Sequence, residues 1–304
     1  MLGATTSPVT VSRVPQSRLF RAFALVIAML IASPAVSVVA AAQPASIPTP
    51  RIISTNICID TLLVALAKPA TITALSPLAA DRRFSTIADK AAGIPSVRFT
   101  AEDIYRLKPS IVFVSNFASP RTRAALTKLG ISVVAVNYAR SINDIKANIT
   151  AMGRTLGTED AAGRLIAALD VAATNRRLSR PLSALQYSRD KFTHGAHSLI
   201  ADIINKAGFT RPARLTGTTY GSFLSSEEVL IADPDLLILD KFTAYDSYNL
   251  KGDYLGFDRD TPQQRQTAFI DTKLWSCGSA AASDLIKQLN IIGQSIVKTN
   301  YAQE

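Results

Sequence analysis

The chain has 304 residues and a formal net charge of +10, from 33 Lys and Arg against 23 Asp and Glu, and 48% of its residues are hydrophobic. This composition is typical of a globular protein and excludes wholesale disorder. Only two His and two Cys are present, which excludes metal sites with three or four such ligands unless carboxylates complete them.

Residues 1–42 predict an export signal. A front with three Arg and no acidic residue precedes an apolar core of eleven residues. Small residues at 40–42 suit a signal peptidase, so we expect cleavage before Gln43 and export of the remaining chain. An uncleaved membrane anchor is the alternative, but the core is shorter than the roughly 20 residues that a spanning helix needs. Residues 43–50 form a Pro-rich tether.

The basic residues are scattered, and the densest groups are pairs such as Arg82-Arg83 and Arg176-Arg177. A nucleic-acid interface needs clustered Lys and Arg, and export also separates the chain from nucleic acid. We therefore expect no nucleic-acid partner. An anionic small ligand is compatible with the net charge.

Residues 51–140 alternate short β-rich runs with amphipathic helices. This alternation predicts parallel strands joined by right-handed crossovers, which is an α/β lobe. The expected strands lie at 52–54, 71–75, 111–115 and 131–136, and the expected helices lie at 59–67, 81–90, 101–107 and 119–129.

Residues 141–178 contain no strand run. Ile142, Ile145 and Ile149 repeat at helical spacing, and a second apolar set follows Gly157. The pattern predicts a single long α-helix, with Gly157 as the place where it would break.

The alternation of strands and helices resumes over residues 179–304, which predicts a second α/β lobe. The fold class is therefore α/β, with two α/β lobes that have central, mostly parallel sheets and are joined by a single long α-helix. The expected strands of the second lobe lie at 183–187, 235–240 and 267–270, and the expected helices lie at 197–207, 226–232 and 280–297.

Several short motifs follow one another along the chain. They are Arg-Ile-Ile-Ser-Thr-Asn-Ile-Cys from residue 51, Leu-Lys-Pro-Ser-Ile-Val-Phe-Val at 107–114, Leu-Gly-Ile-Ser-Val-Val at 129–134, Leu-Ile-Ala-Asp-Pro-Asp-Leu-Leu-Ile-Leu at 230–239 and Leu-Trp-Ser-Cys-Gly at 274–278. Their order and spacing resemble the periplasmic substrate-binding proteins of ABC importers for iron-siderophores, haem and cobalamin. Ser110 stands where that family usually has Asp.

The resemblance implies a periplasmic carrier, expected to be a monomer, that captures an iron complex between its lobes and delivers it to the membrane subunits of an ABC importer. We expect a ferric siderophore as the ligand, and haem or cobalamin is the alternative within the same class. No intrinsic cofactor and no protein-bound metal are expected. A receptor for bare zinc or manganese would need several His or carboxylates, which two His do not supply.

Enzyme signatures are missing from the sequence. It contains no Gly-x-Ser-x-Gly, no His-Glu-x-x-His and no Gly-rich phosphate loop. We therefore predict that the chain is not an enzyme. The alternative from a different class is an exported thiol-dependent enzyme that uses Cys58 and Cys277.

Glu102 and Glu227 begin two helices that precede similar Pro-strand segments, one in each lobe. An acidic residue in the first turn of a helix complements the macrodipole, which alone would explain both. The resemblance adds a second role, since one Glu on each lobe of such proteins docks into Arg pockets of the importer. Glu228 competes with Glu227 for this role.

The resemblance also indicates residues that would line the ligand cleft. His194 and His197 flank a Gly-containing loop that faces the cleft in the family, and we favour cleft lining over metal ligation for them. The aromatic residues of 242–257 either bind ligand or pack on their own lobe. The cleft candidates are Asn56, Cys58, Phe117, Tyr187, His194, His197, Tyr245, Trp275 and Cys277.

Cys58 and Cys277 form an even pair in an exported chain, where thiols normally oxidise. In the family fold both loops border the cleft, one from each lobe, so a disulfide would tie the lobes together. Two separate buried thiols are the alternative. The sequence leaves the choice open, because it gives no distance between the two Cα atoms.

Overall fold

The computed structural model describes residues 49–174, 177–188, 190–215, 217, 219–241 and 266–301. The predicted export signal, Tyr245 and the other aromatic residues of 242–257 lie outside these residues. The described residues belong to one compact unit, Pro48–Glu304, which contains both sheets described below.

The first sheet consists of four parallel strands in the order β2-β1-β3-β4. Alternate side chains of β1 and β3 enter two hydrophobic clusters on opposite faces, as strand geometry requires. The strands are β1 (Ile52–Ser54), β2 (Ile72–Ala74), β3 (Ile111–Ser115) and β4 (Ser132–Val136), and the helices around them are α1 (Ile57–Leu66), α2 (Ala88–Ala91), α3 (Ala101–Arg106) and α4 (Pro120–Lys128).

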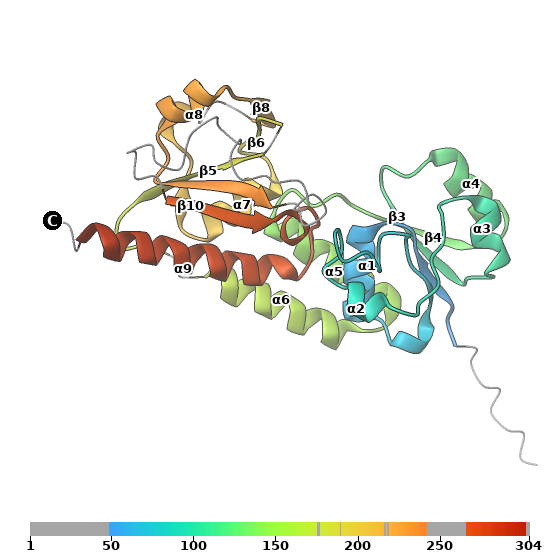
Figure 1. Ribbon diagram of the computed structural model, residues 1–304. Coiled ribbons are helices and arrows are strands. Elements are labelled where there is room, and N and C mark those ends of the chain that lie inside the picture. The colour runs from blue at the N-terminus through green and yellow to red at the C-terminus, as the bar shows by residue number, and fades with distance from the viewer. Residues whose placement is uncertain are drawn as a thin grey trace, which may run out of the picture. The chain divides into compact units, whose positions relative to one another are not determined.

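The second sheet also has four parallel strands, in the order β10-β9-β5-β7. Its strands are β5 (Leu182–Tyr187), β7 (Phe209–Thr210), β9 (Leu236–Lys241) and β10 (Gln266–Asp271). The accompanying helices are α7 (Leu199–Lys206), α8 (Ser226–Ala232) and α9 (Ala281–Tyr301), and short 3₁₀ turns occur at Pro69–Thr71, Ala213–Leu215 and Thr272–Leu274. Helix α9 runs along one side of this sheet (Figure 1) and contacts α6 and α7. The prediction of two α/β lobes with mostly parallel sheets is confirmed.

A two-stranded antiparallel ribbon, β6 (Phe192–His194) with β8 (Gly221–Phe223), was not predicted. Its strands are three residues long and lie far apart in the sequence, so no local periodicity reveals them. Gly221 has φ of +155°, and a Cβ there would lie 2.4 Å from the ring of Phe192. Only glycine fits this close approach of the two strands.

The segment predicted as one long helix is helical but divided at Gly157 into α5 (Ile142–Leu156) and α6 (Glu159–Ala173). Gly157 caps α5 with φ of +65°, the left-handed conformation that glycine adopts without strain. The two helices are antiparallel, because Lys146 bonds Asp170 at 2.8 Å and Gly153 packs on Ala162. Helix α5 contacts both α1 and α7, so it joins the two sheets' helical layers.

One large hydrophobic cluster extends through both lobes. It contains Leu62 of α1, Ile145 of α5, Leu169 of α6, Ile203 of α7 and Leu285 of α9. The lobes therefore share a core. None of the described helices combines the length and the apolar character that crossing a membrane requires. The proposed lobe boundaries at residues 51, 141 and 179 remain predictions.

Candidate functional site

A pocket of about 190 Å³ opens at the carboxyl ends of β1, β3 and β4. Most of its walls come from segments that directly follow these strands, and one wall comes from the loop before α9. Its lining residues are Asn56, Cys58, Leu62, Ser115, Phe117, Val136, Asn137, Tyr138, Ala139, Asn148, Ser276 and Gly278.

The pocket lies where the strand order of the first sheet reverses. The chain passes from β1 outward to β2 and then returns across the sheet to β3. Loops that leave β1 and β3 consequently diverge to opposite faces, and the crevice between them is the usual ligand position in open α/β sheets. Asn56 follows β1 and Ser115 ends β3, so both border this crevice.

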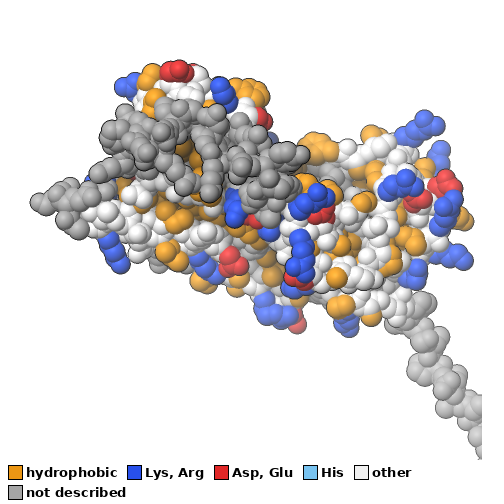
Figure 2. Space-filling model, in the orientation of Figure 1, with side chains coloured by type: hydrophobic (Ala, Val, Ile, Leu, Met, Phe, Trp, Pro, Cys, Tyr) orange, Lys and Arg blue, Asp and Glu red, His pale blue; other side chains and the backbone are white. Residues whose placement is uncertain are grey.

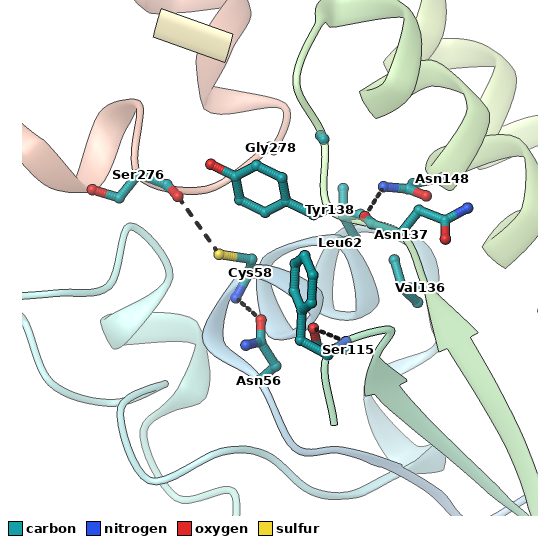
Figure 3. Close-up of a pocket in the computed structure, with 12 residues that line it drawn as sticks. Asn56, Cys58, Leu62, Ser115, Val136, Asn137, Tyr138, Asn148, Ser276 and Gly278 are labelled. Carbon is teal, nitrogen blue, oxygen red and sulfur yellow. Dashed lines mark hydrogen bonds between the residues drawn. The ribbon is translucent and has the colours of Figure 1, made fainter. Parts of the chain in front are cut away.

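Local hydrogen bonds fix the polar side chains of the pocket. Asn56 is the N-cap of α1, and its Oδ1 accepts from the backbone N–H of Cys58 at 2.9 Å. Ser115 Oγ accepts from the N–H of Phe117 at 3.2 Å. The buried Asn148 of α5 donates from Nδ2 to the carbonyl of Asn137 at 2.7 Å, a contact visible in Figure 3.

Two aromatic rings stand at the pocket with most of their surface open to solvent. Phe117 is 76% exposed and Tyr138 is 58% exposed. Their ring centroids lie 6.0 Å apart with the planes tilted by 56°. The ring of Tyr138 extends over the pocket toward the loop that carries Ser276 (Figure 3). Exposed rings that converge on a concave surface suit contact with the apolar or conjugated part of a ligand.

The lining residues that the structure describes carry no charged side chain. Among all the residues that the structure describes, no three or more His, Cys, Asp or Glu side chains are grouped so that they could hold a metal ion. Figure 2 shows Lys and Arg side chains spread over the visible face and interspersed with Asp and Glu. The pocket lining therefore offers aromatic rings, side-chain amides and hydroxyls, and no charge.

Cys58 and Cys277 form a disulfide with Cα atoms 4.8 Å apart. Cys58 is the second residue of α1 in the first lobe, and Cys277 lies just before α9 in the second. The alternative of two separate thiols is wrong. Because these are the only two Cys of the chain, the bridge leaves no free thiol for the thiol-dependent enzyme considered above.

Tyr187 and Trp275, two of the predicted cleft residues, occupy the core and are not among the residues that line the pocket. Tyr187 is fully buried among residues that include Val229, and its hydroxyl donates to the carbonyl of Leu224 at 2.9 Å. Trp275 is 3% exposed and belongs to the large core cluster. Cys277 is also buried, although its neighbours Ser276 and Gly278 reach the pocket.

His194 and His197 lie at the β6–β8 ribbon, outside the residues that line the pocket. His194 is half-buried with its ring edge-on to Phe192 at 5.1 Å. Burial lowers the pKa of His194, and the nearby Asp190 carboxylate opposes this shift. His197 is exposed, and its ring meets that of Tyr220 at 6.2 Å. The structure does not bring the two His together with the pocket aromatics.

Glu102 and Glu227 occupy equivalent positions in their helices. Each is the second residue of its helix, after a hydroxyl N-cap, Thr100 for α3 and Ser225 for α8. Glu228 closes a capping box with Ser225, in which the Glu228 carboxylate accepts from the Ser225 N–H at 2.7 Å. Glu227 is exposed, and hydrogen bonds at the helix start lower its pKa.

Asn137, Tyr138 and Asn148 were missed by the sequence analysis. Asn137 and Tyr138 directly follow the predicted strand at 131–136, so the rule that ligands bind beyond the carboxyl ends of parallel strands would have found them. Asn148 shows no comparable signal, because a polar residue within a helix usually faces solvent.

The sequence model of a family described as periplasmic binding protein matches residues 52–287. Among solved structures, the periplasmic heme-binding protein RhuT of Roseiflexus sp. RS-1 is 21% identical, with a TM-score of 0.66, over 82% of this chain and 99% of that one. The heme-binding protein HutB of Vibrio cholerae is 18% identical, with a TM-score of 0.67, over 80% and 98%.

The vitamin B12 binding protein BtuF of Vibrio cholerae is 16% identical, with a TM-score of 0.61, over 83% of this chain and 99% of that one. At these identities the solved structures establish the fold alone. No curated protein sequence matches the chain. The family match covers most of the chain and agrees with the two parallel sheets and the pocket, and the protein therefore belongs to the periplasmic binding protein family.

Proposed function

We propose that the protein is an exported carrier that binds a metal chelate, with a ferric siderophore as the first candidate, and delivers it to the membrane subunits of an ABC importer. The observation that carries this proposal is the uncharged pocket with two exposed rings and several amides. A metal whose coordination is already complete presents only its organic periphery. Rings and hydrogen-bonding amides suit that periphery, whereas a bare ion would need charged or imidazole ligands.

Haem or cobalamin is the second candidate. The names of the solved structures favour it, because RhuT and HutB are called heme-binding and BtuF is called a vitamin B12 binding protein. Both compounds are large and conjugated, so they could also use the Phe117–Tyr138 pair. The carrier itself performs no chemistry and acts as a monomer in this proposal.

A ligand panel distinguishes the candidates. The quenching of Trp275, the only Trp of the chain, is measured with ferric siderophores, haem and cobalamin, and with ferric, zinc and manganese salts. We expect one chelate to bind and the bare salts not to bind. Tight binding of a bare ion would contradict the proposal.

Removing the two rings tests the site. The double variant Phe117→Ala/Tyr138→Ala should bind the chelate about tenfold more weakly, because aromatic contacts contribute about 0.5–1.5 kcal/mol each. Tyr220→Ala is the matched control, since Tyr220 is 74% exposed and does not line the pocket. Equal affinity of the double variant and this control would place the ligand elsewhere.

We further propose that Glu102 and Glu227 dock the carrier onto Arg residues of the importer. Their equivalent positions on α3 and α8 support this role, and charge-assisted carboxylate–Arg bonds suit a reversible, oriented contact. In the free protein Glu102 pairs with Arg106, a contact that docking would exchange for the importer's Arg. Glu228 competes with Glu227 for this role, and we favour Glu227 because Glu228 closes the capping box of its own helix.

Reversal of both charges tests docking. Glu102→Lys/Glu227→Lys should abolish uptake into cells and leave ligand affinity almost unchanged. The control is Glu159→Lys/Asp160→Lys, which reverses two exposed acidic residues in the first turn of α6. Normal uptake by the first variant, or an equal loss in the control, would contradict the assignment.

A further inference from the structure

The loop that connects β10 to α9 in the second lobe forms part of a pocket whose other walls belong to the first lobe and to α5. Ser276 and Gly278 of this loop line the pocket, and Cys277 between them is bonded to Cys58. We call residues 275–278 the bridging loop. Cys58 itself also lines the pocket, so the disulfide stands at the pocket wall.

The bridging loop is pressed closely on its neighbours. A Cβ placed on Gly278 would lie 2.5 Å from Cβ of Ala139 and 3.2 Å from Cγ1 of Ile145. Sγ of Cys58 lies 3.8 Å from the carbonyl oxygen of Ser276. Glycine at 278 is therefore required by space, because any larger residue would move the loop away from the segment between β4 and α5.

A second contact holds the same region across the lobes. Lys273, just before the bridging loop, donates from Nζ to the carbonyl of Arg82 in the first lobe at 3.4 Å. Lys273 also pairs with Asp271 of β10 at 3.1 Å. These polar contacts are partly exposed, so they stabilise the position of the loop much less than the disulfide does.

We propose that the Cys58–Cys277 disulfide is a positioning element of the ligand pocket: it holds the bridging loop against Ala139 so that the pocket keeps its wall when no ligand is bound. The role as a ligand pocket rests on the proposed function. If the loop is already in place, ligand binding does not have to order it. The free-energy cost of binding is then smaller, so affinity rises and dissociation slows. Without the bridge, the loop moves outward in the free protein.

Trp275 reports the position of the loop without any ligand. It is the only Trp of the chain, lies two residues before Cys277 and is 3% exposed. Its shielding from acrylamide should therefore decrease when the loop moves. The measurement compares the oxidised protein with the variant Cys58→Ser/Cys277→Ser at a temperature where circular dichroism shows both folded.

Loss of a disulfide also lowers global stability, so a control with a similar loss is needed. Leu126→Ala serves, because Leu126 is fully buried in the cluster on the other face of the first sheet and is not a pocket residue. We expect acrylamide quenching of Trp275 to increase about threefold or more in the Ser variant and to remain unchanged in Leu126→Ala, since only the first frees the loop.

Gly278→Ala provides a variant with the disulfide intact. Its new methyl group should displace the loop and increase Trp275 quenching, and the second substitution Ala139→Gly should restore shielding by removing the atom that it meets. With the chelate found in the panel, the Ser variant should release ligand about tenfold faster than Leu126→Ala, as expected for a lost preorganised wall.

Equal Trp275 quenching in the Ser variant and the oxidised protein, together with equal release rates, would overturn the positioning role. Quenching that rises equally in Leu126→Ala would also overturn it, because the change would then follow global stability. If the oxidised protein binds no member of the panel, the proposed function fails, and the quenching comparison alone decides whether the disulfide holds the loop.

Discussion

Asp60 carries a fully buried carboxyl group in the first turn of α1. Its oxygens accept from the backbone N–H of Ser76 at 3.2 and 3.3 Å and from the Ser76 hydroxyl. Burial raises its pKa to about 6, and hydrogen bonds from Ser54 and Ser76 oppose this rise. Asp60 thereby links the carboxyl ends of β1 and β2 beside the crevice.

The raised pKa makes stability depend on pH. The unfolded chain binds fewer protons than the folded protein between about pH 4 and 6, so the free energy of unfolding decreases as the pH rises through this window. The ionised carboxylate should lower stability above about pH 6 by up to about 3 kcal/mol, because each pKa unit corresponds to about 1.36 kcal/mol. Below about pH 4 this cost is absent.

The variant Asp60→Asn should remove most of this dependence. Its free energy of unfolding should exceed that of the unchanged protein at about pH 7.5 and should be similar to it at about pH 4.5, as measured by urea unfolding at both pH values. Asp160→Asn, at an exposed position of α6, is the control. An unchanged pH dependence in Asp60→Asn would show that the buried group does not titrate in this range.

Pocket residues near the carboxyl end of a strand can be predicted from the sequence, whereas Asn148 in the middle of α5 cannot. Asn56 and Phe117, two of the cleft candidates, lie among the residues that line the pocket, because the carboxyl ends of parallel strands meet at one edge of a sheet. Tyr187 and Trp275 have the same residue types as ligand-binding aromatics. Their burial depends on packing between distant segments, which the local sequence does not specify.

Gly157 shows how a single residue determines the arrangement of two helices. Its φ of +65° ends α5 and lets α6 return antiparallel, and a Cβ at this position would meet nothing within 4 Å. The requirement for glycine is therefore one of backbone conformation and not of space. The sequence indicated the break but not the reversal, which depends on the close packing of Gly153 on Ala162.

Gly157→Ala should destabilise the protein by about 1 kcal/mol, because an L-residue in the left-handed region is strained. Gly163→Ala is the matched control. Gly163 lies within α6, where an added Cβ also meets nothing within 4 Å, so alanine should stabilise the helix by about 0.5–1 kcal/mol. Urea unfolding should show a lower free energy of unfolding for Gly157→Ala and a higher one for Gly163→Ala. A change in the same direction in both variants would contradict the role of φ.

Most of the α/β alternation was predictable from apolar runs and helical spacing. Strands β3 and β9, with mainly Ile, Val, Leu and Phe, lie where the sequence placed them. The predicted helix at 81–90 is reduced to α2, Ala88–Ala91, because turns occupy the preceding residues. The β6–β8 ribbon escaped prediction because its pairing joins short segments distant in sequence.

The core that runs through both lobes bears on how an importer would distinguish a loaded carrier from an empty one. Separation of the lobes would expose apolar side chains of α1, α5 and α7 to water and would strain the bridge at Cys277, so large opening is costly. If Glu102 and Glu227 dock the protein as we propose, the distance between them would change little when ligand binds. An empty carrier would then compete with a loaded one for the same receptor, and delivery would depend on the ratio of carrier to chelate outside the membrane.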